Sequence, residues 1–166
     1  CVADGEGRNS VFLAERGVAV TAFDFSPIAV AKPQRLASGR GVTVDYQVGN
    51  IYAWDWTAAA YDAVVAIFIQ FMSPGDRDAV FAGMKAAVKP GGLLLLQGYR
   101  PEQIEYGTGG PPRRENMYTA QWLASQFAGW SVVELDVHDA EIHEGQGHRG
   151  MSALIDLVAT KPGAGR

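Results

Sequence analysis

Residues 3–17 read ADGEGRNSVFLAERG, a turn containing glycines that runs into a helical pattern. The apolar segment before it, Cys1–Ala3, indicates the end of a strand, and Val18–Asp24 indicates a second strand. In a parallel sheet, a turn between the first strand and the first helix presents free amide N–H groups to a ligand. Gly5 and Gly7 would let a ligand come close to the backbone. The same two glycines also suit an ordinary tight turn, so other signals must decide.

Short apolar runs alternate with helical patterns up to Tyr99, which indicates an α/β fold with a parallel sheet and crossover helices. Ser26–Pro27 and Ser73–Pro74 are typical helix starts, an N-cap followed by proline at the first helical position. Pro33 removes a helical hydrogen bond, so we expect a kink or an early end there. The expected elements are a strand at 1–3, a helix at 8–15, a strand at 18–24, a helix from 26, strands at 42–48 and 61–69, a helix from 73 that is ended by KPGG at 89–92, and a fully buried strand at 93–99.

Beyond Tyr99 the pattern changes to a long loop rich in glycine and proline, and loops of this length are usually functional or disordered. Thr119 is expected to open a short helix, and strands are expected at 130–138 and 151–161. The connection between these strands is short and shows no helical pattern, so they should form an antiparallel hairpin. The side chains of the loop that could face a substrate are Tyr106, Arg113, Arg114 and Tyr118.

Length and composition indicate one globular domain over residues 1–166. The net charge of −4 argues against broad binding to a phosphate backbone. One cysteine excludes an internal disulfide and favours a reducing, cytoplasmic location. No signal peptide and no apolar run long enough to cross a bilayer are visible. Because the chain begins inside an apolar segment, we expect the natural N-terminus to lie upstream.

Asp24 makes an adenosine ligand the better interpretation of the glycine turn. It follows Gly5 by 19 residues, at the end of the second strand, where a carboxylate can accept hydrogen bonds from ribose hydroxyls. A dinucleotide loop would have a third glycine at the place of Ser10. The turn also contains Asp4 and Glu6, which would repel a pyrophosphate but not a cation. Both points favour S-adenosylmethionine, which lacks phosphate and carries a sulfonium charge.

On these residues the chain resembles the class I S-adenosylmethionine-dependent methyltransferases, and among them it is similar to the small TehB-like enzymes of tellurite resistance. The first family motif runs roughly D-x-G-x-G-x-G-R-N-S, and this chain has CVADGEGRNS at 1–10. Cys1 and Ala3 depart from the motif's acid and first glycine. The resemblance covers essentially the whole chain. It implies a Rossmann-like, doubly wound, mostly parallel seven-stranded sheet of order 3-2-1-4-5-7-6 with a C-terminal antiparallel hairpin.

The resemblance also implies the cofactor contacts. Asp24 corresponds to the acid that binds the ribose, and Phe25 to the apolar residue that packs on the adenine. Asn50 stands where an acid would meet the adenine amino group, and Phe68 lies in the segment that lines the methionine part. Together the residues expected to bind the cofactor are Ala3, Asp4, Gly5, Gly7, Arg8, Asn9, Asp24, Phe25, Asn50, Ile51, Ala66 and Phe68.

Two residues near the last strand are the candidates for catalysis. His148 and Arg149 resemble a His-Arg pair near the acceptor site of TehB-like enzymes. Arginine suits an anionic acceptor, and histidine could take a proton near neutral pH. Histidines recur at 138, 143 and 148, but this odd spacing alternates faces along a strand, so we expect no metal site. Methyl transfer from a sulfonium needs positioning more than a strong base, so no catalytic triad is expected.

We therefore predict an S-adenosylmethionine-dependent methyltransferase that acts on a small molecule or small oxyanion. No nucleic acid or membrane is expected as a partner, and the protein should be a monomer or a homodimer. Two alternatives stay open at this point. One is a nicotinamide-dependent oxidoreductase of the Rossmann type, and the other is an inactive module that binds S-adenosylmethionine. The sequence does not identify the acceptor.

Overall fold

The computed structural model describes residues 1–143 and 149–163. Its contacts divide the chain into two compact units. Unit 1 holds Cys1–Asp55 together with Val65–Ile67, and unit 2 holds Trp56–Val64 together with Phe68–Arg166. Within the described residues, no helix combines the length and the apolar character that a membrane span requires. The single domain expected over residues 1–166 stays a prediction.

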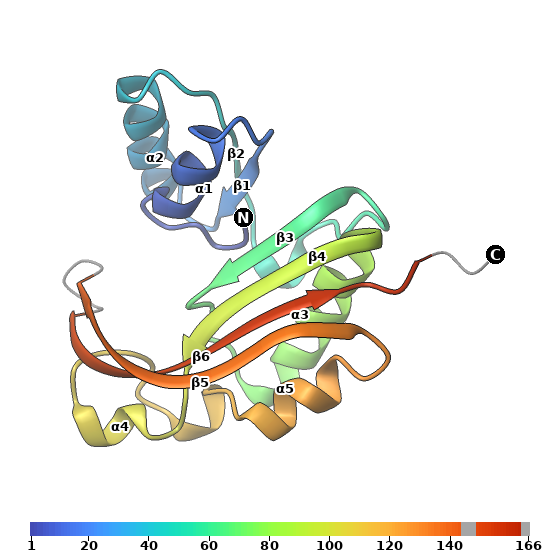
Figure 1. The fold of residues 1–166 in the computed structure, drawn as a ribbon. Helices are drawn as coiled ribbons and strands as arrows, with labels where there is room; N and C mark the ends of the chain where they lie inside the picture. Colours follow the sequence, from blue (N-terminus) through green and yellow to red (C-terminus); the bar gives the residue numbers. More distant parts are fainter. Residues whose placement is uncertain (144–148, 164–166) are drawn as a thin grey trace. The chain divides into compact units, whose positions relative to one another are not determined.

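Unit 1 contains a small parallel sheet with two helices and a short 3₁₀ turn (Figure 1). Strand β1 pairs in parallel with β2, from Thr21 opposite Asp45 to Asp24 opposite Val48. The expected first strand is reduced to Val2, which makes isolated parallel bridges to Phe23 and to Ala66. The elements of unit 1 are α1 (Arg8–Ala14), β1 (Thr21–Asp24), α2 (Pro27–Gly39), β2 (Asp45–Val48) and η1 (Ile51–Ala53).

Helix α2 continues through Pro33 to Gly39, so the expected early end is wrong. Pro33 is buried against the glycine turn. A Cβ atom placed on Gly7 would lie only 2.2 Å from the Cβ of Pro33, which shows how closely the two residues approach. This contact offsets part of the cost of the missing helical hydrogen bond, which is about 3 kcal/mol in an exposed helix. The loss of a helical hydrogen bond at Pro33 can be predicted from the sequence, whereas the burial of its ring against Gly7 cannot.

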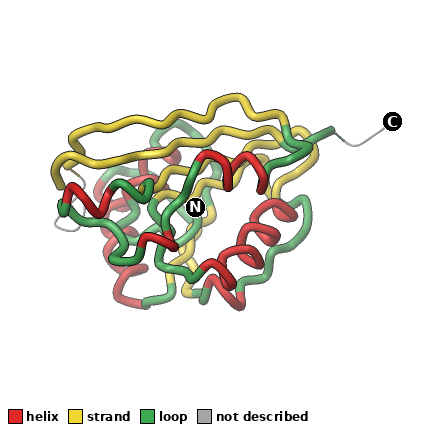
Figure 2. Tube along the Cα trace, turned by 90° about the horizontal axis from the view of Figure 1, so that it is seen from below, coloured by secondary structure: helices red, strands yellow, loops and turns green. Residues whose placement is uncertain are grey.

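The second sheet has four strands in the order β3-β4-β6-β5, and all of it except the last three residues of β3, Val65–Ile67, belongs to unit 2. Figure 1 shows β3 and β4 running in the same direction, whereas β4 pairs with β6 and β6 with β5 in antiparallel fashion. The predicted C-terminal hairpin is therefore confirmed, and its two long strands lie side by side (Figure 2). The elements are β3 (Tyr61–Ile67), α3 (Pro74–Ala87), β4 (Val88–Tyr99), α4 (Gln103–Tyr106), η2 (Arg114–Asn116), α5 (Ala120–Gln126), β5 (Ser131–His143) and β6 (Arg149–Thr160).

Helix α3 begins as its sequence predicts. The Ser73 hydroxyl accepts a hydrogen bond from the amide of Asp76, and proline follows the cap. The predicted apolar face is buried, and Phe81 makes edge contacts with the rings of Trp122 and Phe127 from α5 and its end. The buried members of this face are Val80, Phe81, Met84, Ala87 and Val88. The face therefore holds α3 against the rest of unit 2.

Two expectations about the following strand are wrong. Helix α3 ends at Ala87, directly before the KPGG segment at 89–92, as predicted, and the strand that follows begins earlier than expected because β4 already includes this segment. Residues 93–99 alternate between buried and partly exposed positions, with Leu93 37% exposed, so this strand is not fully buried. The run of leucines satisfied the pattern of a central strand, but one face of β4 is covered less completely than that pattern implies.

The predicted α/β class is confirmed, but the sheet differs from the expected one. The structure has a two-stranded and a four-stranded sheet instead of seven consecutive strands. The difference arises at Val2, where pairing is limited to single bridges instead of a ladder. The strand order across the whole chain remains a proposal.

Candidate functional site

The glycine turn of unit 1 is built from alternate residues in the left-handed region. The backbone φ angles are +47° at Ala3, +59° at Gly5 and +79° at Gly7. Glycine adopts such angles without strain, whereas alanine carries a cost because of its Cβ. The turn is tied to β1 by two hydrogen bonds, from the Asp4 amide to the Phe23 carbonyl at 3.1 Å and from the Gly5 amide to the Asp24 carboxylate at 3.1 Å. The predicted turn is therefore present, with a strained alanine at its start.

Asp24 ends β1 and is 8% exposed. Its Oδ2 accepts the Gly5 amide, and its Oδ1 accepts the Ser26 amide at 3.3 Å. The two bonds fix the direction of the carboxylate. An ionised carboxylate offers about four acceptor positions, so about two remain for a ligand. Asp24 is thus a preformed acceptor beside the turn, as the ribose contact would require.

Asp4 points toward the interior of unit 1 and stabilises the start of α1. Its carboxylate accepts hydrogen bonds from the Ser10 amide at 3.3 Å and from the Ser10 hydroxyl at 2.5 Å. Burial raises the pKa of the Asp4 carboxyl, against the effect of its hydrogen bonds to Ser10. The Ser10 hydroxyl also lies 2.8 Å from the hydroxyl of Tyr46 on β2. Asp4 is among the predicted cofactor residues, but in the structure its side chain binds Ser10 of α1 and so supports the turn.

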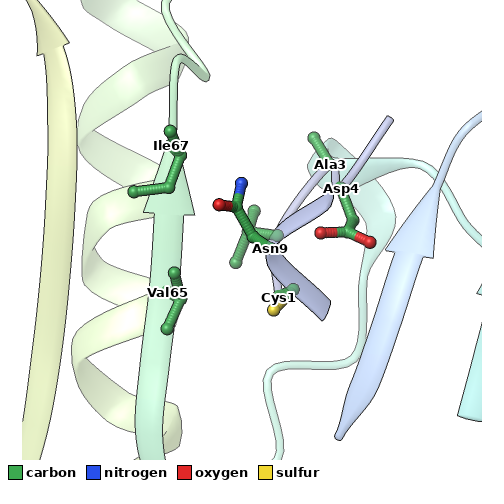
Figure 3. A pocket seen from close by; sticks show the side chains of 7 residues that line it. Cys1, Ala3, Asp4, Asn9, Val65 and Ile67 are labelled. Carbon is green, nitrogen blue, oxygen red and sulfur yellow. The ribbon is translucent and has the colours of Figure 1, made fainter. Parts of the chain in front are cut away.

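A small pocket opens in unit 1 beside the turn (Figure 3). Figure 3 shows the carboxamide of Asn9, at the start of α1, on the side of Ile67, and the Asp4 carboxylate turned away from Val65 and Ile67. The lining combines polar groups of the turn with apolar side chains of β3. Its residues are Cys1, Val2, Ala3, Asp4, Asn9, Val65 and Ile67. Three predicted cofactor residues, at positions 3, 4 and 9, are therefore brought together.

Arg8 and Glu6 lie on the exposed side of the turn, where Glu6 pairs with Arg8 at 3.4 Å and with Lys32 at 2.9 Å. These ion pairs are exposed, and such pairs contribute little to stability. The hydrogen bond with Lys32 is the largest cause of the lowered pKa of Glu6. The acid that the sequence placed near a cationic ligand is therefore already paired with basic side chains.

Exposed apolar side chains follow the ends of β1 and β2. Phe25 is 79% exposed, and Val48 and Tyr52 are each 54% exposed. Asn50 caps η1 by accepting the Tyr52 amide at 3.0 Å, so one acceptor position of its carboxamide oxygen is occupied and another remains. Ile51 is buried, with only its backbone suited to a ligand contact. The ends of β1 and β2 therefore carry exposed apolar side chains together with one polar group, Asn50.

Trp54 is partly buried and packs against the core residue Phe23. Its ring stacks on Phe23 with centroids 3.8 Å apart, and a Cβ on Gly49 would come within 2.5 Å of it. The packing explains the glycine at position 49. Ala66, the predicted contact from β3, is fully buried in unit 1. Both residues therefore shape the surroundings of the site instead of offering a side chain to a ligand.

The remaining predicted residues lie in unit 2 or outside the described residues. Phe68 has a φ of +54° and stacks on Tyr99 at 4.7 Å. Arg149 is exposed at the start of β6, opposite His143, and His148 lies outside the described residues. Tyr118 is fully buried, so the expectation that it faces a substrate is wrong. No cluster of metal-ligating side chains occurs in the residues that the structure describes.

Tyr46 is the functional candidate that the sequence did not indicate. It lies in the middle of β2, and its partner Ser10 is 36 residues away along the chain. Neither residue belongs to a pattern that links the two, and Ser10 lies in α1 whereas Tyr46 lies in β2, so only the folded structure reveals the contact. A tyrosine in a short strand is otherwise expected to pack or to face solvent.

Comparison with known proteins decides the family. Residues 1–92 match the methyltransferase domain family, which is more than half of the chain. The chain belongs to this family. The match includes the glycine turn, Asp24 and the exposed apolar residues after β1 and β2, so the predicted resemblance is confirmed.

Solved structures of methyltransferases have a similar fold. The structure of TehB from Haemophilus influenzae superposes with a TM-score of 0.76 at 19% identity, covering 96% of this chain and 57% of that one. A SAM-dependent methyltransferase from Methanosarcina mazei gives 0.75 at 16% identity, covering 98% and 91%. At such identities these likenesses show the methyltransferase fold alone.

One curated relative covers nearly all of the chain. Hemagglutinin 1 of Eikenella corrodens is 28% identical over 167 residues, which is 96% of this chain and 53% of that protein. The chain therefore spans about half the length of this relative, and a similar share of TehB.

Proposed function

We propose that this protein is an S-adenosylmethionine-dependent methyltransferase that methylates a small molecule or small oxyanion. The observation that carries the proposal is Asp24, a carboxylate held by two backbone amides at the end of β1, directly beside the left-handed turn. Membership of the methyltransferase family supports the choice of cofactor. The fit of the residues supports it too, because the turn presents backbone groups and the surface beyond β1 presents an exposed aromatic ring.

Each part of the site has a proposed task. Asp24 accepts hydrogen bonds from the ribose hydroxyls, and Phe25 packs on the adenine. Asn50 and the backbone of Ile51 meet the polar edge of the base. Gly5 and Asn9 border the remainder of the cofactor from the turn. The further predicted contacts are those of Ala3, Asp4, Gly7, Arg8, Ala66 and Phe68.

The chemistry asks little of the protein beyond positioning. When bound, S-adenosylmethionine supplies a methyl group that its sulfonium charge has already activated. The chain orients the reactants and excludes water, and orientation alone can provide large rate factors. His148 would take a proton from an acceptor whose pKa lies above the ambient pH, and Arg149 would hold an anionic acceptor. These two roles rest on the family resemblance.

The fold-level proposal is a seven-stranded sheet of order 3-2-1-4-5-7-6 in the whole protein. The parallel bridges of Val2 to Phe23 and Ala66 support it, since the first strand of that order lies between the second and the fourth. The antiparallel pairing of β6 with both β4 and β5 supports the end of the order.

A ligand comparison tests the function. Purified protein is titrated with S-adenosylhomocysteine and, separately, with NADH by isothermal calorimetry. The proposal predicts saturable binding of S-adenosylhomocysteine and none of NADH; binding of NADH alone would overturn it. Turnover is then measured with labelled S-adenosylmethionine and a panel of thiols, amines, phenols and selenite. Cofactor binding without turnover across the panel would favour a module that only binds the cofactor.

A further inference from the structure

A series of hydrogen bonds connects β2, through α1, to the glycine turn. The Ser10 hydroxyl lies 2.5 Å from the Asp4 carboxylate and 2.8 Å from the Tyr46 hydroxyl. Because an ionised carboxylate only accepts, Ser10 donates to Asp4, and its oxygen is left to accept from Tyr46. The direction is therefore Tyr46 to Ser10 to Asp4. Consecutive hydrogen bonds of this kind are cooperative, because each donated bond polarises the next hydroxyl and strengthens the bond that it donates.

These hydrogen bonds lie in a closely packed part of unit 1. Ser10 has no exposed surface. A Cβ on Gly7 would approach the Tyr46 hydroxyl to 2.9 Å, so Tyr46 also contacts the turn directly. Burial is the largest cause of the raised pKa of Tyr46. A tyrosine hydroxyl is protonated at neutral pH and can donate. The hydroxyl of Tyr46 is therefore placed to support the turn both by a hydrogen bond and by contact.

The turn needs such support because of Ala3. Its φ of +47° is a left-handed conformation, which a residue with a Cβ adopts only at a cost in free energy. Conformations of this kind persist only where the surroundings hold them. The neighbour of Ala3 in sequence is Asp4, the last member of the series of hydrogen bonds. Asp4 is thus fixed at its backbone by Phe23 and at its side chain by Ser10.

We propose that Tyr46 is a positioning residue for the cofactor. Through Ser10 and Asp4 it holds Ala3 in the left-handed conformation, and this keeps the Gly5 amide on the Asp24 carboxylate. The proposal rests on the proposed function, because its effect is read through the binding of S-adenosylhomocysteine. Loss of the Tyr46 hydroxyl should free the turn to relax, so that Asp24 and the turn must be reordered when the ligand binds.

The test is a set of calorimetric titrations with S-adenosylhomocysteine at a temperature where every variant is fully folded. Tyr46→Phe should raise the dissociation constant about fivefold, the effect of losing roughly one net hydrogen bond. Ser10→Ala should raise it at least as much, and the double variant should be no weaker than Ser10→Ala alone, since both act through one series of hydrogen bonds. Tyr61→Phe, a change of the same kind at a half-buried tyrosine of unit 2, is the matched control and should bind like the wild type.

Rescue distinguishes positioning from general stability. Glycine adopts the left-handed conformation without cost, so Ala3→Gly should recover most of the affinity that Tyr46→Phe loses. A merely structural role would lower the melting temperature of Tyr46→Phe, leave its dissociation constant unchanged and give no rescue. That result, or an equal loss with and without Ala3→Gly, would overturn the proposal. If the wild type itself bound no S-adenosylhomocysteine, the proposed function would fail, which is a different outcome from binding that ignores Tyr46.

Discussion

The glycine turn of unit 1 and the hairpin end of unit 2 differ in how their predicted site residues are held. At the turn, Asp24 and Asp4 each accept two hydrogen bonds, and every partner lies within the same unit. At the hairpin, Arg149 is exposed beside the end of β5, whose residues are mostly exposed. The turn is therefore preorganised, whereas Arg149 is an exposed charge at the start of β6.

This difference matches two kinds of task. A cofactor of constant shape is best bound by groups that are already fixed, because less ordering entropy is lost on binding. An acceptor differs from one methyltransferase to the next, and variable contacts are generally carried by loops and exposed segments. The comparison thus explains why the cofactor can be proposed from the structure while the acceptor is confined to a class.

The largest expected effect is at Gly7. Alanine there would place its Cβ 2.2 Å from Pro33 and in a left-handed backbone, so Gly7→Ala should destabilise the protein by about 3 kcal/mol or more. Gly5→Ala is the matched control, because Gly5 also has a left-handed backbone but no atom within 4 Å of the added Cβ. It should cost only about 1–2 kcal/mol. Urea denaturation measures both, and equal losses would contradict the packing of Pro33 on the turn.

The next effect concerns ligand affinity. Asp24→Ala should weaken binding of S-adenosylhomocysteine by about 1–3 kcal/mol, the usual cost of losing hydrogen bonds to a charged acceptor. Calorimetry gives the dissociation constant, and Asp45→Ala on the neighbouring strand, at an exposed carboxylate, should leave it unchanged. An Asp24 variant that binds like the wild type would remove the ribose contact from the account.

How far the sequence predicted these regions follows from the range of the signals. Local signals were reliable: Ser73 caps α3, Thr119 caps α5, and the antiparallel hairpin forms. Signals that depend on distant partners failed. The burial of Pro33 against Gly7 and the contact of Tyr46 with Ser10 each join residues that only the paired strands and helices of unit 1 bring together.

The site shows the same division. The turn and Asp24 follow from glycine spacing and strand ends, but the left-handed angle at Ala3 could not be predicted, since alanine normally avoids it. The inward direction of Asp4 was missed as well, because a sequence gives no side-chain orientation. For catalysis, His148 lies outside the described residues and Arg149 is exposed, so their roles stay predictions.

A smaller effect on stability is expected at the hairpin. Arg149→Ala removes an exposed side chain, so the free energy of unfolding should change by less than about 0.5 kcal/mol. Affinity for S-adenosylhomocysteine should not change, whereas turnover with the best acceptor of the panel should fall. Unchanged turnover would exclude Arg149 from acceptor binding. A loss of cofactor affinity would contradict the assignment of the cofactor to the turn and of the acceptor to the hairpin.

The smallest effect is the pH dependence of the turn. Burial raises the pKa of Asp4 in the folded protein above its ordinary value, so protonation of Asp4 favours folding. Its contribution is fully present below the unfolded pKa, about 3.9, and is lost as the pH rises through the folded pKa. The free energy of unfolding is measured as a function of pH for the wild type and for Asp4→Asn, which lacks this ionisable group. The wild-type value minus the Asp4→Asn value should decrease as the pH rises. A difference that instead grew in the wild type's favour with rising pH would mean that the Ser10 bonds outweigh burial.

The most direct test of the central claim is a crystal structure of the protein with S-adenosylhomocysteine. The account predicts the ribose hydroxyls at hydrogen-bond distance, about 2.5–3.0 Å, from the Asp24 carboxylate, with the Gly5 amide still bound to it. A ligand bound elsewhere, or an Asp24 carboxylate turned away from the ribose, would contradict it.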